Sequence, residues 1–94
     1  MNQTIYKYPV PIENRFSLML PKGAEIICVK GPSQRMGTNI YAIIYTDRVE
    51  TQRHFELFST GEVMSTDTTV QRKYIGTFND GNFVGHLFER ININ

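Results

Sequence analysis

Two histidines and one cysteine are the residues best suited to metal binding or nucleophilic catalysis. His54 and His86 each lie within an apolar run, and neither has a second ligand at a spacing typical of a metal site. Cys28 lies between Ile27 and Val29, a setting that indicates a packed core thiol rather than an activated thiolate. We therefore expect no metal site, no cofactor and no catalytic cysteine.

Other catalytic signatures are missing from the sequence. The acidic residues are scattered, with no spacing that marks a general acid–base pair. There is no Gly-x-Ser-x-Gly elbow and no glycine-rich loop that could cradle a phosphate. We expect a protein that is not an enzyme; the alternative, a small enzyme, requires His54 or His86 to line a pocket beside a carboxylate.

Basic, aromatic and methionine side chains are the stronger candidates for binding. Arg35 and Met36 lie between glycines in the long loop expected over residues 31–39, where they would suit a protein interface. Tyrosines close to arginines can also stack a base and hold a phosphate, although the same aromatic residues are typical of an antiparallel core. The predicted binding residues are Arg35, Met36, Tyr41, Tyr45, Arg48 and Arg53.

The composition favours strands. Of the 94 residues, 36 are Ile, Val, Thr, Tyr or Phe, whereas Ala and Leu together number 6. A hydrophobic content of 40% argues against disorder, and the length fits a single domain over residues 1–94. The net charge of +1 gives no long-range attraction to nucleic acids or anionic membranes.

Short apolar runs separated by turn signals indicate where the strands lie. The segment 5–12 predicts an edge strand or an extended arm, because Pro9 and Pro11 cannot donate ladder hydrogen bonds. The run 25–30 predicts a strand buried on both faces, and 40–45 predicts a central strand. Further strands are expected over 15–20, 51–58, 73–78 and 83–88.

Turn residues complete the expected fold. Asp80-Gly81 between two apolar runs predicts a β-hairpin, and Pro21-Lys22-Gly23 predicts a second turn. No stretch has sustained helical spacing, which leaves at most one short helix between residues 62 and 72. The sequence predicts an all-β fold, a small antiparallel sandwich or partly open barrel of six or seven strands, with frayed ends at 1–4 and 91–94.

Several phrases of the sequence together resemble a known family. They are Tyr-Lys-Tyr-Pro-Val-Pro at 6–11 and Leu-Pro-Lys-Gly-Ala at 20–24, with shorter ones at 53–55, 59–61, 74–78 and 86–89. This set resembles a family of short uncharacterised proteins encoded by phages and bacterial genomes, described only as a domain of unknown function. The resemblance spans about residues 5–89 and departs at 59–69. It implies a phage-related accessory protein in the bacterial host cytoplasm, and it assigns no catalytic residues.

The functional expectation is a small non-enzymatic accessory protein that binds a host protein and inhibits or redirects it, with counter-defence as one purpose. Capture of a small nucleotide or signalling molecule is the first alternative, and a nucleic-acid-binding regulator is the second. We also expect a homo-oligomer, because a small domain gains buried surface by pairing. No membrane association is expected, because no apolar run approaches the roughly 20 residues of a membrane-spanning helix.

Overall fold

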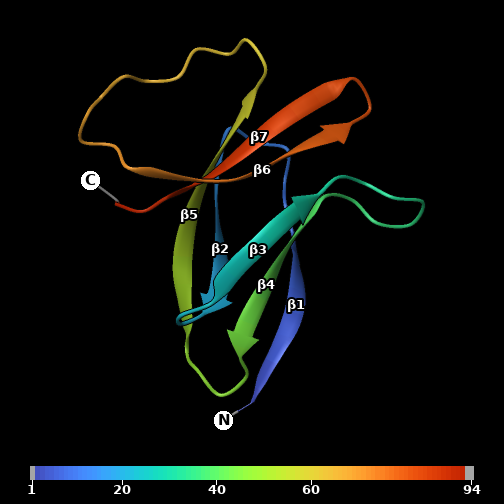
Figure 1. Ribbon diagram of the computed structural model, residues 1–94, viewed down its shortest axis with the longest axis vertical. Coiled ribbons are helices and arrows are strands. Elements are labelled where there is room, and N and C mark those ends of the chain that lie inside the picture. The colour runs from blue at the N-terminus through green and yellow to red at the C-terminus, as the bar shows by residue number, and fades with distance from the viewer. Residues whose placement is uncertain (1, 93–94) are drawn as a thin grey trace.

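Seven β-strands make up the regular structure of the described part of the chain (Figure 1). This computed structural model describes residues 2–92, and no helix occurs within that range. The strands are β1 (Gln3–Pro9), β2 (Arg15–Pro21), β3 (Glu25–Lys30), β4 (Asn39–Tyr45), β5 (Glu50–Ser59), β6 (Arg72–Asp80) and β7 (Phe83–Arg90).

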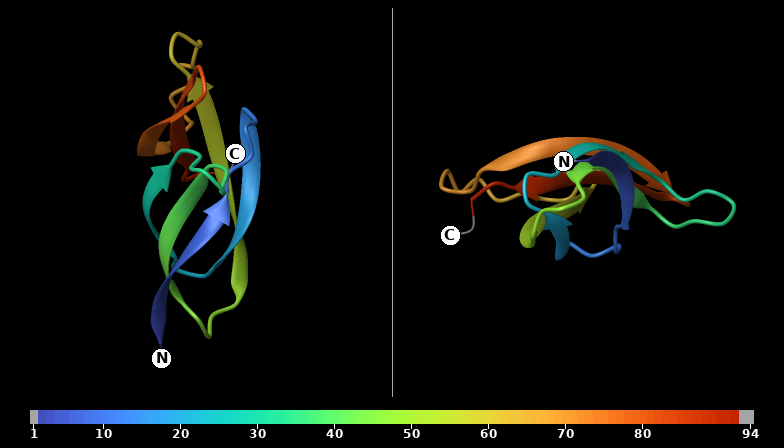
Figure 2. Two further views of the ribbon diagram at one scale, coloured as in Figure 1. Left: turned by 90° about the vertical axis from the view of Figure 1, so that its right-hand side faces the viewer. Right: turned by 90° about the horizontal axis from the view of Figure 1, so that it is seen from below.

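The strands form two open antiparallel sheets. Sheet A has three strands in the order β1-β4-β3, and sheet B has four in the order β2-β5-β7-β6. The chain passes from one sheet to the other between β1 and β2, between β2 and β3, and between β4 and β5, so the layers are built from interleaved segments (Figure 2). The expected all-β antiparallel sandwich is confirmed, with seven strands.

Both predicted turns are present, and glycine supplies the positive φ that each requires. Asp80 pairs with Phe83 across a two-residue loop whose first member, Gly81, has φ +61°. Glycine at that position fits the hairpin turns that match strand twist. At the end of β2, the N–H of Ala24 donates to the carbonyl of Pro21 at 3.0 Å, and Gly23 has φ +81°. This second turn carries the chain from sheet B to sheet A.

The core lies between the two sheets. Along β4, Ile40, Ala42 and Ile44 are buried, which confirms the central position predicted for this strand. Sheet B supplies larger side chains, with Phe55 and Leu87 almost fully buried. The alternation of buried and half-buried residues follows the period of two expected for strands that bury one face.

The strand β3 differs from its prediction. We expected it to be buried on both faces, but Ile27 is 46% exposed and Cys28 is only half-buried. A register shift between Ile26 and Cys28 interrupts the pairing with β4. No layer of the described chain covers sheet A on its far side, so one face of β3 stays open and Cys28 is not a core thiol.

Backbone hydrogen bonds extend close to both ends of the described part of the chain. Gln3 and Thr4, expected to fray, pair with Tyr45 and Ile44 at the start of β1. Near the other end, the N–H of Ile91 donates to the carbonyl of Gln71 at 3.0 Å. Backbone hydrogen bonds therefore hold Gln3, Thr4 and Ile91, and residues 1 and 93–94 of the predicted frayed ends lie outside the described part of the chain.

The two sides of the sandwich are closed to different degrees. On one side β3 lies directly against β6, and a Cβ built on Gly31 would lie 2.3 Å from the backbone oxygen of Asn79. Nearby, a Cβ on Gly76 would lie 2.9 Å from Cγ1 of Val29. On the other side, between β1 and β2, there is a groove of about 320 Å³ lined by Thr4, Tyr6, Tyr8, Pro21, Ile44, Thr46, Arg48 and Glu50.

The close approach of β3 to β6 predicts that alanine destabilises the protein at Gly31 but is tolerated at Gly37. Gly31→Ala should lower the free energy of unfolding by about 1–3 kcal/mol, because backbone cannot yield as a flexible side chain can. Gly37→Ala is the matched control, since nothing lies within 4 Å of its added Cβ. Urea denaturation of both variants tests this, and equal stability of the two would show that β3 and β6 are not in close contact.

Candidate functional site

The face of sheet A turned away from sheet B holds two of the predicted binding residues. Because the even-numbered residues of β4 are buried, alternation places Tyr41, Ile43 and Tyr45 on the opposite face, where all three are half-buried. They lie in a row along the central strand of the sheet. The exposed parts of these three side chains are available to a partner. The backbone of β4 is held by its pairing with β1 on one side and β3 on the other.

The neighbouring strands extend this row. Register places Ile5 of β1 beside Ile43, and Lys7 beside Tyr41, while Cys28 of β3 lies beside Tyr41 on the other side. Ile5 is 60% exposed. We call this apolar surface the sheet A strip; it consists of Ile5, Tyr41, Ile43 and Tyr45.

Two further predicted residues lie at the margin of the sheet A strip. The guanidinium carbon of Arg48 lies 4.1 Å from the ring centroid of Tyr45, a cation–π contact. Met36 lies in the loop 31–38, and its Sδ is 2.8 Å from Nζ of Lys7. The structure thus brings Met36, Tyr41 and Tyr45 to one side of the molecule, with Arg48 at the border between this side and the groove between β1 and β2.

Positive charge predominates around the sheet A strip. Lys7 lies on the face itself, Arg48 lies against Tyr45, and the exposed Arg35 lies next to Met36 in the loop. Exposed Lys30 is at the end of β3, and Glu25 beside Ile43 is the acidic residue that the register places on this face. Asp47 precedes Arg48 in the turn after β4, and Glu50 lines the groove between β1 and β2 together with Arg48, so the excess of positive charge comes from Lys7, Lys30 and Arg35.

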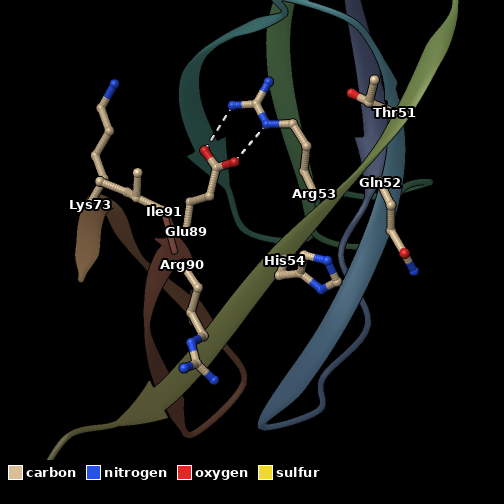
Figure 3. A pocket seen from close by; sticks show the side chains of 8 residues that line it. All are labelled: Thr51, Gln52, Arg53, His54, Lys73, Glu89, Arg90 and Ile91. Atoms are coloured by element: carbon tan, nitrogen blue, oxygen red, sulfur yellow. Dashed lines mark hydrogen bonds and ion pairs between the residues drawn. The ribbon is translucent and has the colours of Figure 1, made fainter. Parts of the chain in front are cut away.

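Arg53, the remaining predicted residue, lies elsewhere and is already engaged. Its Nε and Nη2 donate to the two carboxylate oxygens of Glu89 at 2.6 and 2.8 Å, and its Nη1 donates to the carbonyl of Ala24 at 2.6 Å (Figure 3). Both charged side chains are largely buried. The hydrogen bonds to Glu89 raise the pKa of Arg53 above its usual value. Arg53 therefore links β5, β7 and the start of β3.

The groove beside this ion pair has a volume of about 480 Å³. Lys73 and Arg90 also line it, but Figure 3 shows Lys73 pointing away from the guanidinium of Arg90, so the cations do not converge. His54 lines the same groove, but the register of β5 and β7 puts its side chain and that of Glu89, which Arg53 holds, on opposite faces of sheet B. Within residues 2–92 there is no group of three His, Cys, Asp or Glu residues that could hold a metal ion.

The outer face of sheet B contains a second buried ion pair. Glu56 is only 3% exposed, and its Oε1 accepts a hydrogen bond from Nε of Arg72 at 2.6 Å. Arg72 also lies 5.5 Å from the ring centroid of Phe58. These three side chains satisfy one another, so they contribute to stability and are not free to bind a partner.

His86 is also fully engaged on that outer face. Its Nδ1 lies 2.9 Å from Oγ1 of Thr77, and its Nε2 lies 2.8 Å from Oγ1 of Thr60. Both ring nitrogens thus have hydroxyl partners and neither faces a carboxylate. The network continues from Thr77 to the hydroxyl of Tyr74 at 2.5 Å.

Sequence reasoning missed Ile5 and Lys7 as parts of the candidate site. Their places follow from the pairing of β1 with β4, two strands separated by the 29 residues 10–38. The local signal was present, because alternation in the first segment separates Ile5 and Lys7 from Tyr6 and Tyr8. The identity of the neighbouring strand, however, carries no local signal.

The groove between β1 and β2 places two tyrosines close together. The rings of Tyr6 and Tyr8 lie 5.6 Å apart in an edge-to-face arrangement. Burial raises the pKa of the Tyr8 hydroxyl above its ordinary value, and the negative charges of Glu50 and of ionised Tyr6 raise it further. The neutral phenol is therefore the form that the folded state favours.

The Arg53 contacts predict a structural role. Glu89→Ala should lower the free energy of unfolding by about 2–4 kcal/mol, because it leaves a largely buried guanidinium without its carboxylate. The double variant Arg53→Met/Glu89→Leu should recover most of that loss in urea denaturation. A loss below about 0.5 kcal/mol for Glu89→Ala would instead mark the pair as screened by solvent.

The Tyr8 environment predicts a loss of stability in alkali. A raised pKa in the folded state means that the stabilisation is complete below the ordinary pKa of 10.0 and is lost as pH rises through the higher folded value. Thermal unfolding between pH 8 and 11.5 should show a smaller alkaline decrease in Tm for Tyr8→Phe than for the wild type. Identical pH profiles would contradict this assignment.

Comparison with known proteins places the chain in a family without giving it an activity. No curated protein and no solved structure matches the sequence. Within residues 2–92, no helix is long and apolar enough to cross a membrane. The whole chain, residues 1–94, matches a domain of unknown function (DUF7352), and the protein belongs to that family.

Proposed function

We propose that this protein is a non-enzymatic binding module whose sheet A strip docks a partner protein. The observation that carries the proposal is the exposure of Ile5 beside Tyr41, Ile43 and Tyr45 on a sheet face that no other layer of the described chain covers. Contiguous apolar surface with a polar rim is typical of protein interaction sites. Aromatic residues and arginine are enriched in such interfaces.

The charge around the strip specifies the kind of partner. Lys7, Lys30 and Arg35 lie around the apolar residues, and Glu25 is the opposing charge that the register places on this face. A partner surface that carries apolar side chains within an acidic rim would complement this arrangement, because complementary potentials accelerate encounter and exclude like-charged competitors. In the phage-type setting implied by the sequence resemblance, the partner is a host protein in the bacterial cytoplasm, which binding inhibits or redirects.

The alternatives receive less support from the geometry. Arg53 would have to release Glu89 before it could hold a phosphate, and Arg48 already lies over one face of Tyr45. Capture of a small nucleotide, or of single-stranded nucleic acid, would therefore require these contacts to be replaced. Both alternatives predict a rise in Tm with nucleotides or oligonucleotides, which a thermal-shift screen measures.

Site-specific photo-crosslinking in nuclease-treated bacterial lysate tests the proposal. A benzophenone amino acid at position 41 should crosslink a protein, and the same group at position 74 on sheet B should not, although Tyr74 is itself exposed. Raising the salt concentration should weaken the crosslink, since charge contributes to the encounter. Equal crosslinking from both positions, or none from position 41, would overturn the proposal.

A further inference from the structure

The outer edge of β1 is a free sheet edge. β1 pairs with β4 on one side, and no strand of the described chain pairs with its other side. In Figure 1, β1 forms the lower right margin of the molecule, and the left view of Figure 2 looks onto it with no segment in front. A free edge presents unpaired N–H and C=O groups to any extended chain that reaches it.

The register identifies which groups point outward. The N–H of Val10 donates to the carbonyl of Thr38, and the N–H of Thr46 donates to that of Asn2. In an antiparallel ladder every second residue bonds to the neighbour, so the even-numbered residues of β1 face β4. The odd-numbered residues therefore direct their N–H and C=O groups to the free edge. They are Gln3, Ile5, Lys7 and Pro9, of which Pro9 has no N–H.

We propose that a second copy of this chain pairs with this edge, antiparallel, about a two-fold axis at Ile5. In that register Ile5 lies opposite Ile5 of the second copy, and Gln3 lies opposite its Lys7. The N–H groups of Gln3, Ile5 and Lys7 in each copy then donate to carbonyls of Lys7, Ile5 and Gln3 in the other copy. Two-fold symmetry therefore gives six hydrogen bonds in total. Pro9 falls beyond the paired stretch, so its missing donor costs nothing.

The side chains are compatible with this register. Lys7 is the single charged side chain of β1, and it would face a glutamine, so no like charges lie opposite each other. Ile5, which is 60% exposed, would pack against its own copy across the axis. The two copies of sheet A would form one continuous six-stranded sheet with both sheet A strips on the same face.

The size of the contact sets the expected strength. One edge strand of seven residues gives an interface at the small end of the range for specific complexes. We therefore expect a reversible dimer with a Kd in the micromolar range. The inference does not depend on the proposed function, because the purified protein alone tests it.

Hydrogen exchange followed by NMR gives the sharpest test. At a protein concentration of about 1 mM the amides of Gln3, Ile5 and Lys7 should be protected, and dilution should remove that protection. The amides of Tyr6 and Tyr8 should stay protected throughout, because they bond to β4. A monomer at about 1 mM by analytical ultracentrifugation, or a dimer that leaves the three odd-numbered amides unprotected, would overturn the inference.

A charge exchange at the axis provides an independent test. Ile5→Lys and Ile5→Glu should each weaken dimerisation at least about tenfold, because each places like charges opposite each other. An equimolar mixture of the two should restore the dimer. Val49→Lys is the matched control, since Val49 is 73% exposed in the turn between β4 and β5 and should leave dimerisation unchanged. Failure of the mixture to dimerise, with both variants folded by circular dichroism, would contradict pairing at Ile5.

Discussion

The close contact between β3 and β6 is the constraint on which the arrangement of the two sheets depends. These strands belong to different sheets and share no ladder, yet Gly31 lies against the backbone of Asn79. Only a residue without a Cβ permits that approach. Closing the sandwich on this side brings Val29 onto β6 at Gly76 and leaves the opposite side, between β1 and β2, open. The free edge and the groove are thus consequences of where the glycines lie.

Strand β5 shows how buried charge can specify a register. Arg53 faces the space between the sheets and bonds to Glu89, whereas Glu56 faces outward and bonds to Arg72. A slip of β5 by one residue would exchange its two faces and separate both pairs. Each broken pair would leave a largely buried charge without its partner, which is costly. The two ion pairs therefore contribute more to the uniqueness of the fold than to any binding.

The fold was predictable to the extent that its signals are local. Alternation along 40–45, the glycine turns after Pro21 and Asp80, and the prolines of the first segment all act within a few residues. The exposure of Ile27 and Cys28 was not predictable, because it depends on whether another layer covers sheet A. For the same reason the sequence suggested Met36, Tyr41, Tyr45 and Arg48 one by one, but only strand pairing showed that Ile5 and Lys7 join them and that Arg53 does not.

The positions of two prolines bear on how this β-rich chain avoids fibrous aggregation. Backbone hydrogen bonds join Lys22 to Val49 and Asn14 to Leu57, so the even-numbered positions along β2 bond to β5. The odd-numbered residues therefore direct their N–H and C=O groups to the free edge of β2. The last of these residues is Pro21, which has no N–H. Pro9 holds the equivalent place on β1. The free edges of β1 and β2 therefore each offer three N–H donors before a proline interrupts the ladder. The edge strands on the other side, β3 and β6, lie against each other. Such edges can accept a short strand, but they cannot seed the long, uninterrupted ladder that a cross-β fibre requires.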